Sequence, residues 1–314
     1  MQRWRGLDDL PGGWGRCVAT IGVFDGVHRG HQALIGQAVR LAREHGLPSV
    51  LVTFDPHPSE VVRPGSHPAQ LTTLRRKAEL VEQLGVDVFC VLPFTAELSK
   101  VPADGFVHEY LVDKLHVAAV VVGENFTFGH RAAGNVELLT RLGGRFGFAA
   151  HGASLVTADA GITFSSTYIR ACIDAGDVAA AEAALGRPHR LEGIVVRGDG
   201  RGHELGYPTA NLSMPRFAAV PADGVYACRF VLPGSEVVRD AAVSVGTNPT
   251  FSGRERRVEA YVLDVDEDFY GQRVALDFVE RLRGMERFAS SAELVEKMHE
   301  DVARTRELLA ERGR

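Results

Sequence analysis

Two histidines stand close together at the start of one predicted helix. Residues 22–31 read G-V-F-D-G-V-H-R-G-H and directly follow a short apolar run. Glycine lets the backbone approach a ligand closely, and a helix N-terminus offers free N–H groups to an anion. The imidazoles of His28 and His31 can also donate to the charge that builds up on a phosphate during its transfer. The spacing therefore predicts a site for a nucleotide phosphate.

A second polar segment, residues 165–170, reads S-S-T-Y-I-R. Three hydroxyl side chains at a helix start, with Arg170 about one turn later, form a suitable phosphate cradle. Taken alone, the segment would be interpreted as an ordinary helix cap with a surface arginine. Because it shares a predicted α/β half with the two histidines, we favour the functional interpretation.

Two further loops of this half follow predicted strands. The segment T-F-D-P-H-P at 53–58 is either a rigid proline turn or part of a ligand crevice. In G-E-N-F-T-F-G at 123–129, the asparagine could hold a base or a phosphate, and the aromatic rings could either stack on a ligand or belong to the core. The candidate residues of these loops are Phe54, His57, Pro58, Asn125, Phe126 and Phe128.

The two segments 22–31 and 165–170 together resemble the signatures of the flavin adenylyltransferases, a branch of the nucleotidyltransferase superfamily. The resemblance implies that His28, His31 and Arg170 are catalytic. The chain departs from the family pattern at Thr127 and Asn135, where arginine and aspartate are common among relatives. The ATP-binding residues it implies are Gly22, Phe24, Asp25, Gly26, His28, Gly30, His31, Asn125, Ser165, Ser166, Thr167 and Arg170. The flavin-binding residues it implies are Phe54, His57, Pro58, Phe126 and Phe128.

A glycine-rich segment in the second half leads into P-T-A-N at 208–211. It has neither the Gly-Lys-Ser/Thr ending of a P-loop nor a following helix, so the common nucleotide fingerprints do not apply. It is either a mobile loop or a flap whose backbone amides bind phosphates. Thr209 and Asn211 share a face on an extended chain, and both offer neutral oxygen ligands suited to Mg²⁺ that ATP phosphates also hold.

Glu259 lies in an alternating segment, R-V-E-A-Y-V-L-D at 257–264. Val258, Ala260 and Val262 share one face, so Glu259 points to the other. On this pattern alone, the carboxylate would most often be a solvated strand residue. Together with P-T-A-N and the loop G-T-N-P-T-F, however, this strand resembles the riboflavin kinases.

The resemblance to riboflavin kinases implies that Glu259 is the catalytic base for the ribityl 5′-hydroxyl as that oxygen attacks the γ-phosphate. It also implies that Thr209 and Asn211 hold Mg²⁺. The ATP-binding residues would be Gly198, Gly200, Gly202, Gly206, Thr209 and Asn211. The flavin-binding residues would be Asn248, Thr250 and Glu259.

The elements that must position these residues change character along the chain. Buried strands are predicted at 17–24, 48–54, 86–92 and 118–122, and helices at 31–45, 74–84, 102–115, 136–142 and 166–185. This alternation predicts an α/β fold with a doubly wound parallel sheet, which the resemblance assigns to the nucleotidyltransferase type. An interruption after Gly186 places the domain boundary there, with an adenylyltransferase domain over 1–186 and a kinase domain over 187–314.

The second half has short strands separated by Gly, Pro and Asp. They are predicted at 191–196, 225–232, 241–245, 257–265 and 272–282. A capping-box pattern beginning at Ser290 opens a terminal helix, so we predict an antiparallel β-barrel followed by this helix. We expect one apolar stripe of the helix to pack in the core over the barrel. The stripe is formed by Leu294, Met298, Val302 and Leu309.

Composition excludes several classes of protein. The 314 residues, 45% hydrophobic and 24% charged, are typical of a globular protein of about two domains. A formal net charge of −5 argues against a general nucleic-acid or anionic-membrane binder. We expect no signal peptide and no membrane span, and four scattered cysteines without metal-ligand spacing favour a reducing, cytoplasmic location. The sequence leaves a homo-oligomer open.

Both resemblances together cover residues 20–309 and point to the bacterial bifunctional riboflavin kinase/FAD synthetases. Such an enzyme makes FMN from riboflavin and ATP in its C-terminal half. Its N-terminal half makes FAD from FMN and ATP with release of pyrophosphate. The implied partners are riboflavin, FMN and ATP with Mg²⁺, and no nucleic acid or membrane. Two alternatives stay open: a single-activity flavokinase with a degenerate adenylyltransferase half (or the reverse), and a non-catalytic flavin-binding regulator.

Overall fold

The chain folds into two compact units. A computed structural model describes residues 1–154, 156–157, 161, 163–198, 206–235, 237–250 and 253–313, without the side chains of 248–250 and 253–255. The first unit comprises Met1–Pro68 and Leu74–Ser165, and the second comprises Ala69–Thr73 and Ser166–Arg314. No helix in the described ranges is both long enough and apolar enough to cross a membrane.

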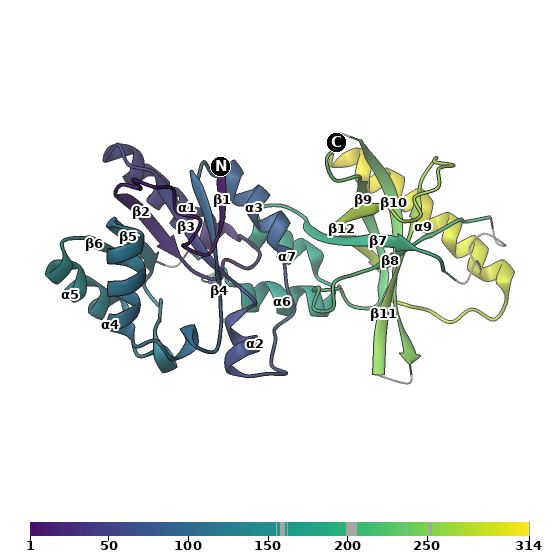
Figure 1. Cartoon of the computed structure of the whole chain (residues 1–314). Coiled ribbons are helices and arrows are strands. Elements are labelled where there is room, and N and C mark those ends of the chain that lie inside the picture. The colour runs from purple at the N-terminus through teal and green to yellow at the C-terminus, as the bar shows by residue number, and fades with distance from the viewer. Residues whose placement is uncertain are drawn as a thin grey trace. The chain divides into compact units, whose positions relative to one another are not determined.

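The first unit is built on a parallel sheet with the strand order β1-β4-β3-β2-β5-β6 (Figure 1). Its strands are β1 (Gln2–Arg5), β2 (Cys17–Ile21), β3 (Ser49–Asp55), β4 (Val88–Pro93), β5 (Val117–Gly123) and β6 (Ala149–Ala153). Its helices are α1 (Arg29–Glu44), α2 (Pro58–Val62), α3 (Leu74–Gln83), η1 (Leu98–Lys100), α4 (Ala103–Phe106), η2 (Val107–Lys114), η3 (His130–Ala132) and α5 (Val136–Phe146). The predicted parallel sheet is confirmed. The edge strands β1 and β6 were not predicted because neither Q-R-W-R nor A-A-H-G-A forms a run of large apolar residues.

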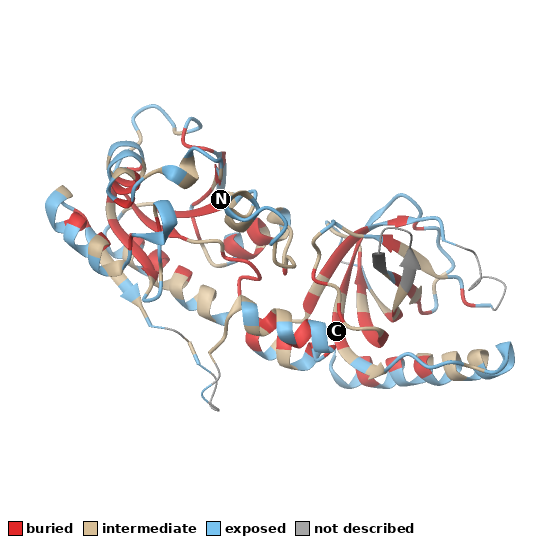
Figure 2. Cartoon of the chain, turned by 90° about the horizontal axis from the view of Figure 1, so that it is seen from below, coloured by how far each residue is buried: buried red, intermediate tan, exposed pale blue. Residues whose placement is uncertain are grey.

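Helices cover both faces of this sheet. Cys17, Ala19 and Ile21 of β2 join a core with residues of α4, η2 and α5. Val18, which points to the opposite face, packs with residues of α1. The buried residues of the unit gather on the central strands and on the inner sides of these helices (Figure 2). The sheet is therefore doubly wound, as predicted.

β2 marks the point where the chain changes direction across the sheet. β3 and β4 lie on one side of it, and β5 and β6 lie on the other. Open α/β sheets bind ligands outside the carboxyl ends of their strands at such a point. The loop after β2, residues 22–28, and the loop after β5 lie at this edge of the sheet.

The second unit is a closed antiparallel barrel with the strand order β10-β11-β8-β7-β12-β9, as predicted. Its strands are β7 (His189–Val196), β8 (Ala210–Ser213), β9 (Gly224–Val231), β10 (Val238–Thr250), β11 (Gly253–Val262) and β12 (Arg273–Arg283). Its helices are α6 (Ser166–Ala175), α7 (Val178–Leu185) and α9 (Ser291–Glu311). The 166–185 stretch is thus two helices rather than one, and β8 was not predicted because it is only four residues long.

The terminal helix α9 begins at the predicted cap. The Ser290 hydroxyl accepts a hydrogen bond from the Glu293 amide at 3.2 Å. Leu309 is buried on the barrel, as expected. The prediction was wrong for the other three residues of the stripe, Leu294, Met298 and Val302, because they line a cavity instead of filling a core.

Residues Ala69–Thr73, between α2 and α3, belong to the second unit. The Gln70 amide donates to the Phe217 carbonyl at 2.6 Å, and the Ala219 amide donates to the Gln70 carbonyl at 2.9 Å. Arg170 Nε of α6 donates to the Ala69 carbonyl at 2.6 Å. The chain therefore enters the second unit, returns to the first, and crosses for the last time just before α6.

Candidate active sites

The loop after β2 adopts a strained backbone. Phe24 and Val27 have φ angles of +50° and +41°, and Gly26 between them has +84°. A residue other than glycine in this left-handed region costs about 1–3 kcal/mol, and such strain persists only where the surroundings impose it. One such restraint is visible at the end of the loop, where Gln32 Nε2 donates to the Val27 carbonyl at 2.9 Å. The loop is therefore held in shape by its neighbours.

His28 and His31, the histidine pair, stack on each other at the N-terminus of α1. Their ring centroids are 3.6 Å apart with an interplanar angle of 23°. His28 is the N-cap of α1, and its Nδ1 accepts a hydrogen bond from the His31 amide at 3.4 Å. A Cβ atom at Gly30 would lie 3.0 Å from Cε1 of His28, so a larger residue there would press on the ring. The Phe24 ring meets the His31 ring edge-on, with the ring centroids 5.3 Å apart.

His31 is poised as a neutral imidazole. Burial is the main cause that holds the pKa of His31 well below its ordinary value of 6.5, and the charges of His28 and Lys77 lower it further. The Nδ1 atom of His31 is buried and has no hydrogen-bond partner among the described residues. A buried ring nitrogen without a hydrogen bond costs free energy, and a ligand that supplies this bond would remove the cost.

The other residues predicted for this nucleotide site fall in two places. The Asn125 side chain lies at the end of β5, where a Cβ atom at Gly123 would be 3.2 Å from Asn125 Oδ1. Ser165 is the last residue of the first unit. Ser166, Thr167 and Arg170 lie on α6 of the second unit. It therefore stays a prediction that these residues lie close to the histidine pair.

The aromatic residues predicted to bind flavin differ in burial. Phe128 is buried in the core, with its ring centroid 6.0 Å from that of Phe106. Phe126 is half-buried and stacks on Phe128 at 5.5 Å. Phe54 is also half-buried and meets Phe94 edge-on at 5.5 Å. Phe54 and Phe126 thus keep surface for a ligand, whereas Phe128 mainly supports Phe126.

Helix caps account for three other residues of these loops. His57 is the N-cap of α2, with Nδ1 accepting from the Ser59 amide at 3.1 Å and Pro58 in the first turn. Asn135, where the resemblance leads us to expect aspartate, caps α5 by accepting from the Leu138 amide at 2.9 Å. Asparagine and aspartate cap helices about equally well. The departure at Asn135 therefore leaves the local structure intact.

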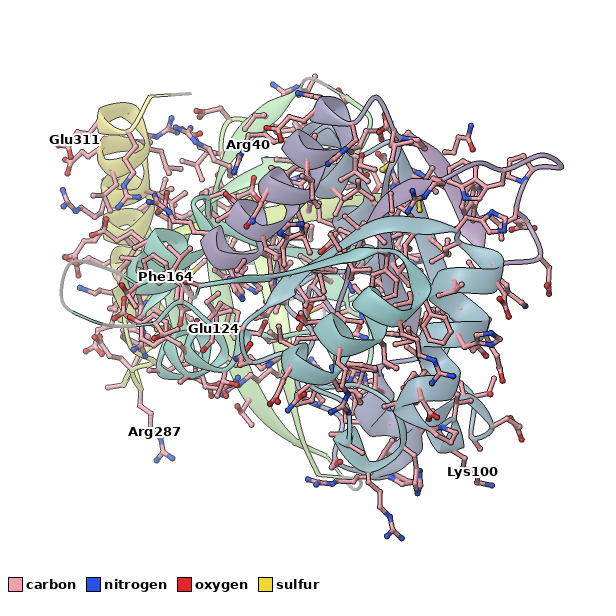
Figure 3. All side chains as sticks on the ribbon, turned by 90° about the vertical axis from the view of Figure 1, so that its left-hand side faces the viewer. Arg40, Lys100, Glu124, Phe164, Arg287 and Glu311 are labelled. Atoms are coloured by element: carbon pink, nitrogen blue, oxygen red, sulfur yellow. The ribbon has the colours of Figure 1, made fainter. Side chains whose placement is uncertain are left out.

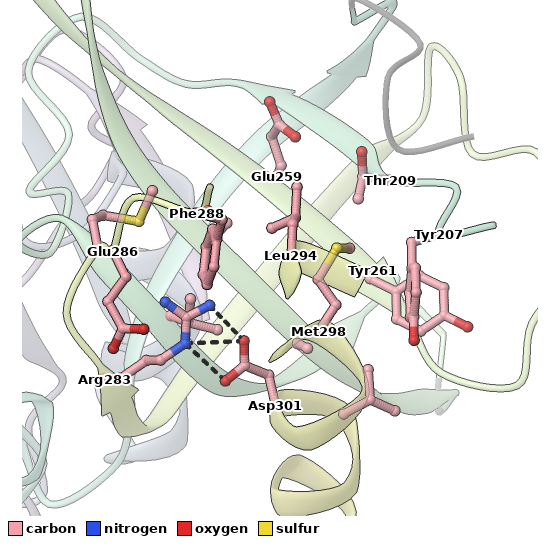
Figure 4. A pocket seen from close by; sticks show the side chains of 15 residues that line it. Tyr207, Thr209, Glu259, Tyr261, Arg283, Glu286, Phe288, Leu294, Met298 and Asp301 are labelled. Atoms are coloured by element: carbon pink, nitrogen blue, oxygen red, sulfur yellow. Dashed lines mark hydrogen bonds and ion pairs between the residues drawn. The ribbon is translucent and has the colours of Figure 1, made fainter. Parts of the chain in front are cut away.

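A cavity of about 230 Å³ lies between the outer face of the barrel and α9 (Figure 4). Apolar side chains form much of its wall, and three aromatic residues, Tyr207, Tyr261 and Phe288, also line it. The rings of Tyr207 and Tyr261 meet edge-on at 4.9 Å. A flat, largely apolar ligand with a few polar groups suits such a wall.

Polar side chains form one row across three neighbouring strands. In the register of the barrel, Glu259 of β11 lies opposite Ser244 of β10 and opposite Asn211 of β8. Residues directly opposite each other share a face of the sheet. Val258, the neighbour of Glu259, is buried inside the barrel, so the row faces outward and the predicted orientation of Glu259 is confirmed. Glu259 lies with Thr209 at one end of the cavity (Figure 4).

The glycine at 198 has a steric reason. A Cβ atom there would lie 2.2 Å from Asn211 Nδ2, so a larger residue would displace that amide. Asn211 Nδ2 also lies 3.5 Å from the Thr209 carbonyl, to which it donates. Gly206 has a φ of +81°, which favours glycine. Gly200 and Gly202 lie outside the described residues, as do the side chains of Asn248 and Thr250.

An ion pair at the other end of the cavity was missed by sequence reasoning. Arg283 Nε donates to Asp301 Oδ1 at 3.0 Å and Arg283 Nη2 donates to Asp301 Oδ2 at 2.8 Å (Figure 4). The side chains are only 13% and 9% exposed, and the guanidinium lies 5.7 Å from the Phe288 ring centroid. The pair therefore ties α9 to β12 and supports the ring that lines the cavity. The available signal was an aspartate on the apolar stripe of α9.

A buried lysine in the first unit was also missed. Lys77 of α3 is 6% exposed, whereas Lys100 and Arg287 extend away from the ribbon (Figure 3). Nζ of Lys77 donates to the Val23 carbonyl, in the loop after β2, at 2.7 Å. The available signal was again a charged residue on an apolar helix stripe, between Leu74 and Val81.

Comparisons with known proteins match both units. The FAD synthetase family model matches residues 12–168, and the riboflavin kinase family model matches residues 185–309. The bifunctional riboflavin kinase/FMN adenylyltransferase of Pseudomonas fluorescens is 39% identical over 311 residues, which cover 99% of this chain and 98% of that protein. The protein of the same name from Escherichia coli K12 is 35% identical over 291 residues, covering 93% and 92%.

A solved structure shows the same architecture. A crystal structure described as a macrolide-efflux protein from Streptococcus pneumoniae matches with a TM-score of 0.88 and 31% identity, covering 98% of this chain and 99% of that one. Both family models match in order, and the relatives match over nearly their whole length. The chain therefore belongs to the family of bifunctional riboflavin kinase/FMN adenylyltransferases.

Proposed function

We propose that the chain makes FMN and then FAD at two separate sites. The barrel unit phosphorylates riboflavin with ATP and releases ADP, and the parallel-sheet unit transfers AMP from ATP to FMN and releases pyrophosphate. The observation that carries this proposal is that one chain holds both an outward-facing Glu259 at an apolar cavity and a stacked histidine pair at the sheet's carboxyl edge. Each arrangement suits one of the two reactions.

In the kinase reaction, Glu259 acts as the base. It accepts the proton of the ribityl 5′-hydroxyl while that oxygen forms a bond to the γ-phosphorus of ATP, and the bond to the β–γ bridging oxygen breaks. Glu259 lies at one end of the cavity, so the isoalloxazine ring occupies the apolar remainder beside Tyr261 and Phe288. Asn248 and Thr250 are proposed as further flavin contacts, and glycines 198–206 as contacts of the ATP phosphates.

The residues beside Glu259 fit Mg²⁺. Thr209 and Asn211 offer neutral oxygen ligands, and Asn211 lies opposite Glu259 in the strand register. Mg²⁺ is commonly held by few protein oxygens together with substrate phosphates. In the part of the chain that the structure describes, no three His, Cys, Asp or Glu side chains could hold a metal together, so the ATP phosphates must supply much of the charge. When bound, the ion neutralises charge on those phosphates.

The adenylyl transfer needs no strong base. The FMN phosphate is already an anion, and one of its oxygens forms a bond to the α-phosphorus of ATP as pyrophosphate leaves. Positioning and electrostatic stabilisation then dominate. His28, His31 and the N-terminal end of α1 supply donors in the first unit. We place Asn125, Ser165, Ser166, Thr167 and Arg170 against the same nucleotide, and Phe54, His57, Pro58, Phe126 and Phe128 around the flavin.

The domain limits are proposed at 1–186 and 187–314. The ranges of the two family models, 12–168 and 185–309, support this division. The compact units instead keep α6 and α7 with the barrel.

We also propose a cytoplasmic location. The four cysteines, all within the described ranges, are buried and form no disulfide. Burial raises the pKa of the Cys17 and Cys90 thiols to about 12.

The proposal is tested by incubating the protein with riboflavin, ATP and Mg²⁺ and following the flavins by chromatography. FMN should appear first and FAD should follow. Accumulation of FMN, with added FMN left unchanged, would indicate a single-activity flavokinase. Riboflavin binding without any turnover would indicate a regulator, although such a protein has no reason to keep Glu259 and the histidine pair.

A further inference from the structure

A buried cation lies directly behind the loop that carries the histidine pair. Nζ of Lys77 donates to the Val23 carbonyl at 2.7 Å and lies within 3.5 Å of Thr53 Oγ1. Thr53 Oγ1 donates to the same carbonyl at 3.1 Å. One carbonyl oxygen of the loop therefore accepts from two buried side chains, which come from α3 and β3.

Burying a charged lysine at this position costs folding free energy. Its neighbours on the same face of α3, Ala78 and Val81, are ordinary core residues. Burial lowers the pKa of Lys77, and the charges of Asp25 and Asp55 oppose this shift. A packing role alone would be served by leucine or methionine without the cost of burying a charge. The ammonium group must therefore serve the loop itself.

Val23 lies at the start of the turn in this loop. It directly precedes Phe24, the first residue of this loop with a positive φ, and the turn then continues through Gly26 and Val27 to His28. Strained backbone is kept only when its surroundings over-determine it. Two donors on the Val23 carbonyl at the start of the turn, and Gln32 on the Val27 carbonyl at its end, meet this condition.

We propose that Lys77 is a positioning residue for adenylyl transfer, which fixes the Val23 carbonyl and thereby the loop that sets His28 and His31 against the phosphates of ATP. The inference rests on the proposed adenylyltransferase function. Lys77 acts through the loop rather than by touching substrate, because its ammonium group is buried behind the loop and bonded to it. A second consequence is electrostatic: the Lys77 charge disfavours protonation of His31.

The test uses the full-length chain and measures its two activities separately. Lys77→Met keeps the volume and removes the charge and the donor. We expect it to lower kcat/KM for ATP in FAD formation about 10- to 100-fold, because a charge-assisted hydrogen bond in the site is lost. The rate of FMN formation should not change. Lys100→Met, at an exposed lysine of the same unit, should leave both rates unchanged.

Two further variants separate positioning from packing. Lys77→Arg keeps a cationic donor and should recover most of the activity that Lys77→Met loses. Thr53→Val removes the second donor and should cost about 3- to 10-fold, by the loss of a neutral hydrogen bond. The double variant should lose less than the product of the single effects, because both residues act on one carbonyl.

Histidine NMR supplies a readout that a packing role would not move. The titration midpoint of His31 should rise in Lys77→Met and stay unchanged in Thr53→Val. Wild-type FAD formation in Lys77→Met, or equal losses of both activities with loss of folded protein, would overturn the inference. If the wild-type chain cannot convert FMN to FAD, the proposed function itself fails, and the inference fails with it.

Discussion

The two proposed sites share ATP as a co-substrate but consist of different residue types. The parallel-sheet site offers imidazoles, a glycine and the N-terminal end of a helix. The barrel site offers a carboxylate in a row of polar side chains beside an apolar cavity. The difference follows the nucleophile: a phosphate oxygen arrives already charged, whereas an alcohol must lose a proton. On the proposed function, the protonation state of the nucleophile accounts for the different side chains of the two units.

The two sites also differ in how they hold their functional groups. In the barrel, regular strand register places Glu259 opposite Asn211 and Ser244, and no strain is needed. In the first unit, a loop with positive φ at Phe24 and Val27 presents the histidine pair, and buried side chains must hold it. A site built on register should tolerate substitutions around it better than one built on a strained loop.

The largest expected effect is that of Glu259→Gln. Loss of the base should lower FMN formation by about 10²- to 10⁴-fold, while conversion of added FMN to FAD stays unchanged. Steady-state assays with each flavin substrate measure the two rates. Glu296→Gln, at an exposed glutamate of α9, is the matched control. Loss of both activities in a folded Glu259→Gln protein would contradict the comparison of two independent sites.

The reciprocal change is His28→Ala combined with His31→Ala. Removal of the donors that stabilise transferring charge should lower FAD formation by about 10²- to 10³-fold, with riboflavin phosphorylation unaffected. His45→Ala, at the exposed C-terminal end of α1, controls for loss of a histidine from the same helix. Persistence of FAD formation in the double variant would mean that adenylyl transfer does not depend on this pair.

Asp301→Asn tests the apolar site through its ion pair. Breaking a buried pair typically costs about 3–5 kcal/mol, so denaturant unfolding should show the barrel unit destabilised and the KM for riboflavin should rise. Asp264→Asn, which breaks the exposed pair with Arg306, should change little. A double replacement, Arg283→Met with Asp301→Leu, should restore much of the stability. Unchanged unfolding of Asp301→Asn would refute the role given to the pair.

The smallest expected effect is a pH dependence of stability from His31. Its pKa is lowered in the folded state, so below pH 6.5 the unfolded chain binds a proton that the folded chain does not. Stability should therefore fall as the pH drops from 7 to 5, at no more than about 1.4 kcal/mol per pH unit from this residue. His31→Gln should lose less stability over the same range. An identical pH dependence in both proteins would show that His31 is not responsible.

Much of the fold could be predicted because its signals are local. Apolar runs marked the central strands, and the two-residue period of a strand placed Glu259 on the outer face of the barrel. Lys77 and Asp301 could not be assigned in this way. Each sits on an apolar helix stripe, and the partners that explain it are distant in sequence: Val23 is 54 residues from Lys77, and Arg283 is 18 residues from Asp301. Local patterns carry no information about such partners.

The passage of residues 69–73 through the second unit bears on how this gene can be divided. Gln70 exchanges backbone hydrogen bonds with Phe217 and Ala219, so a kinase cut out at residue 187 would lose both of these bonds. An N-terminal fragment ending at residue 186 would keep the bond from Arg170 to the Ala69 carbonyl but lose both backbone bonds of Gln70. The two proposed reactions belong to different units. Residues 69–73 nevertheless belong to the barrel unit, although the residues on both sides of them belong to the first unit. A viable split of the coding sequence would have to supply this short peptide to the barrel in trans.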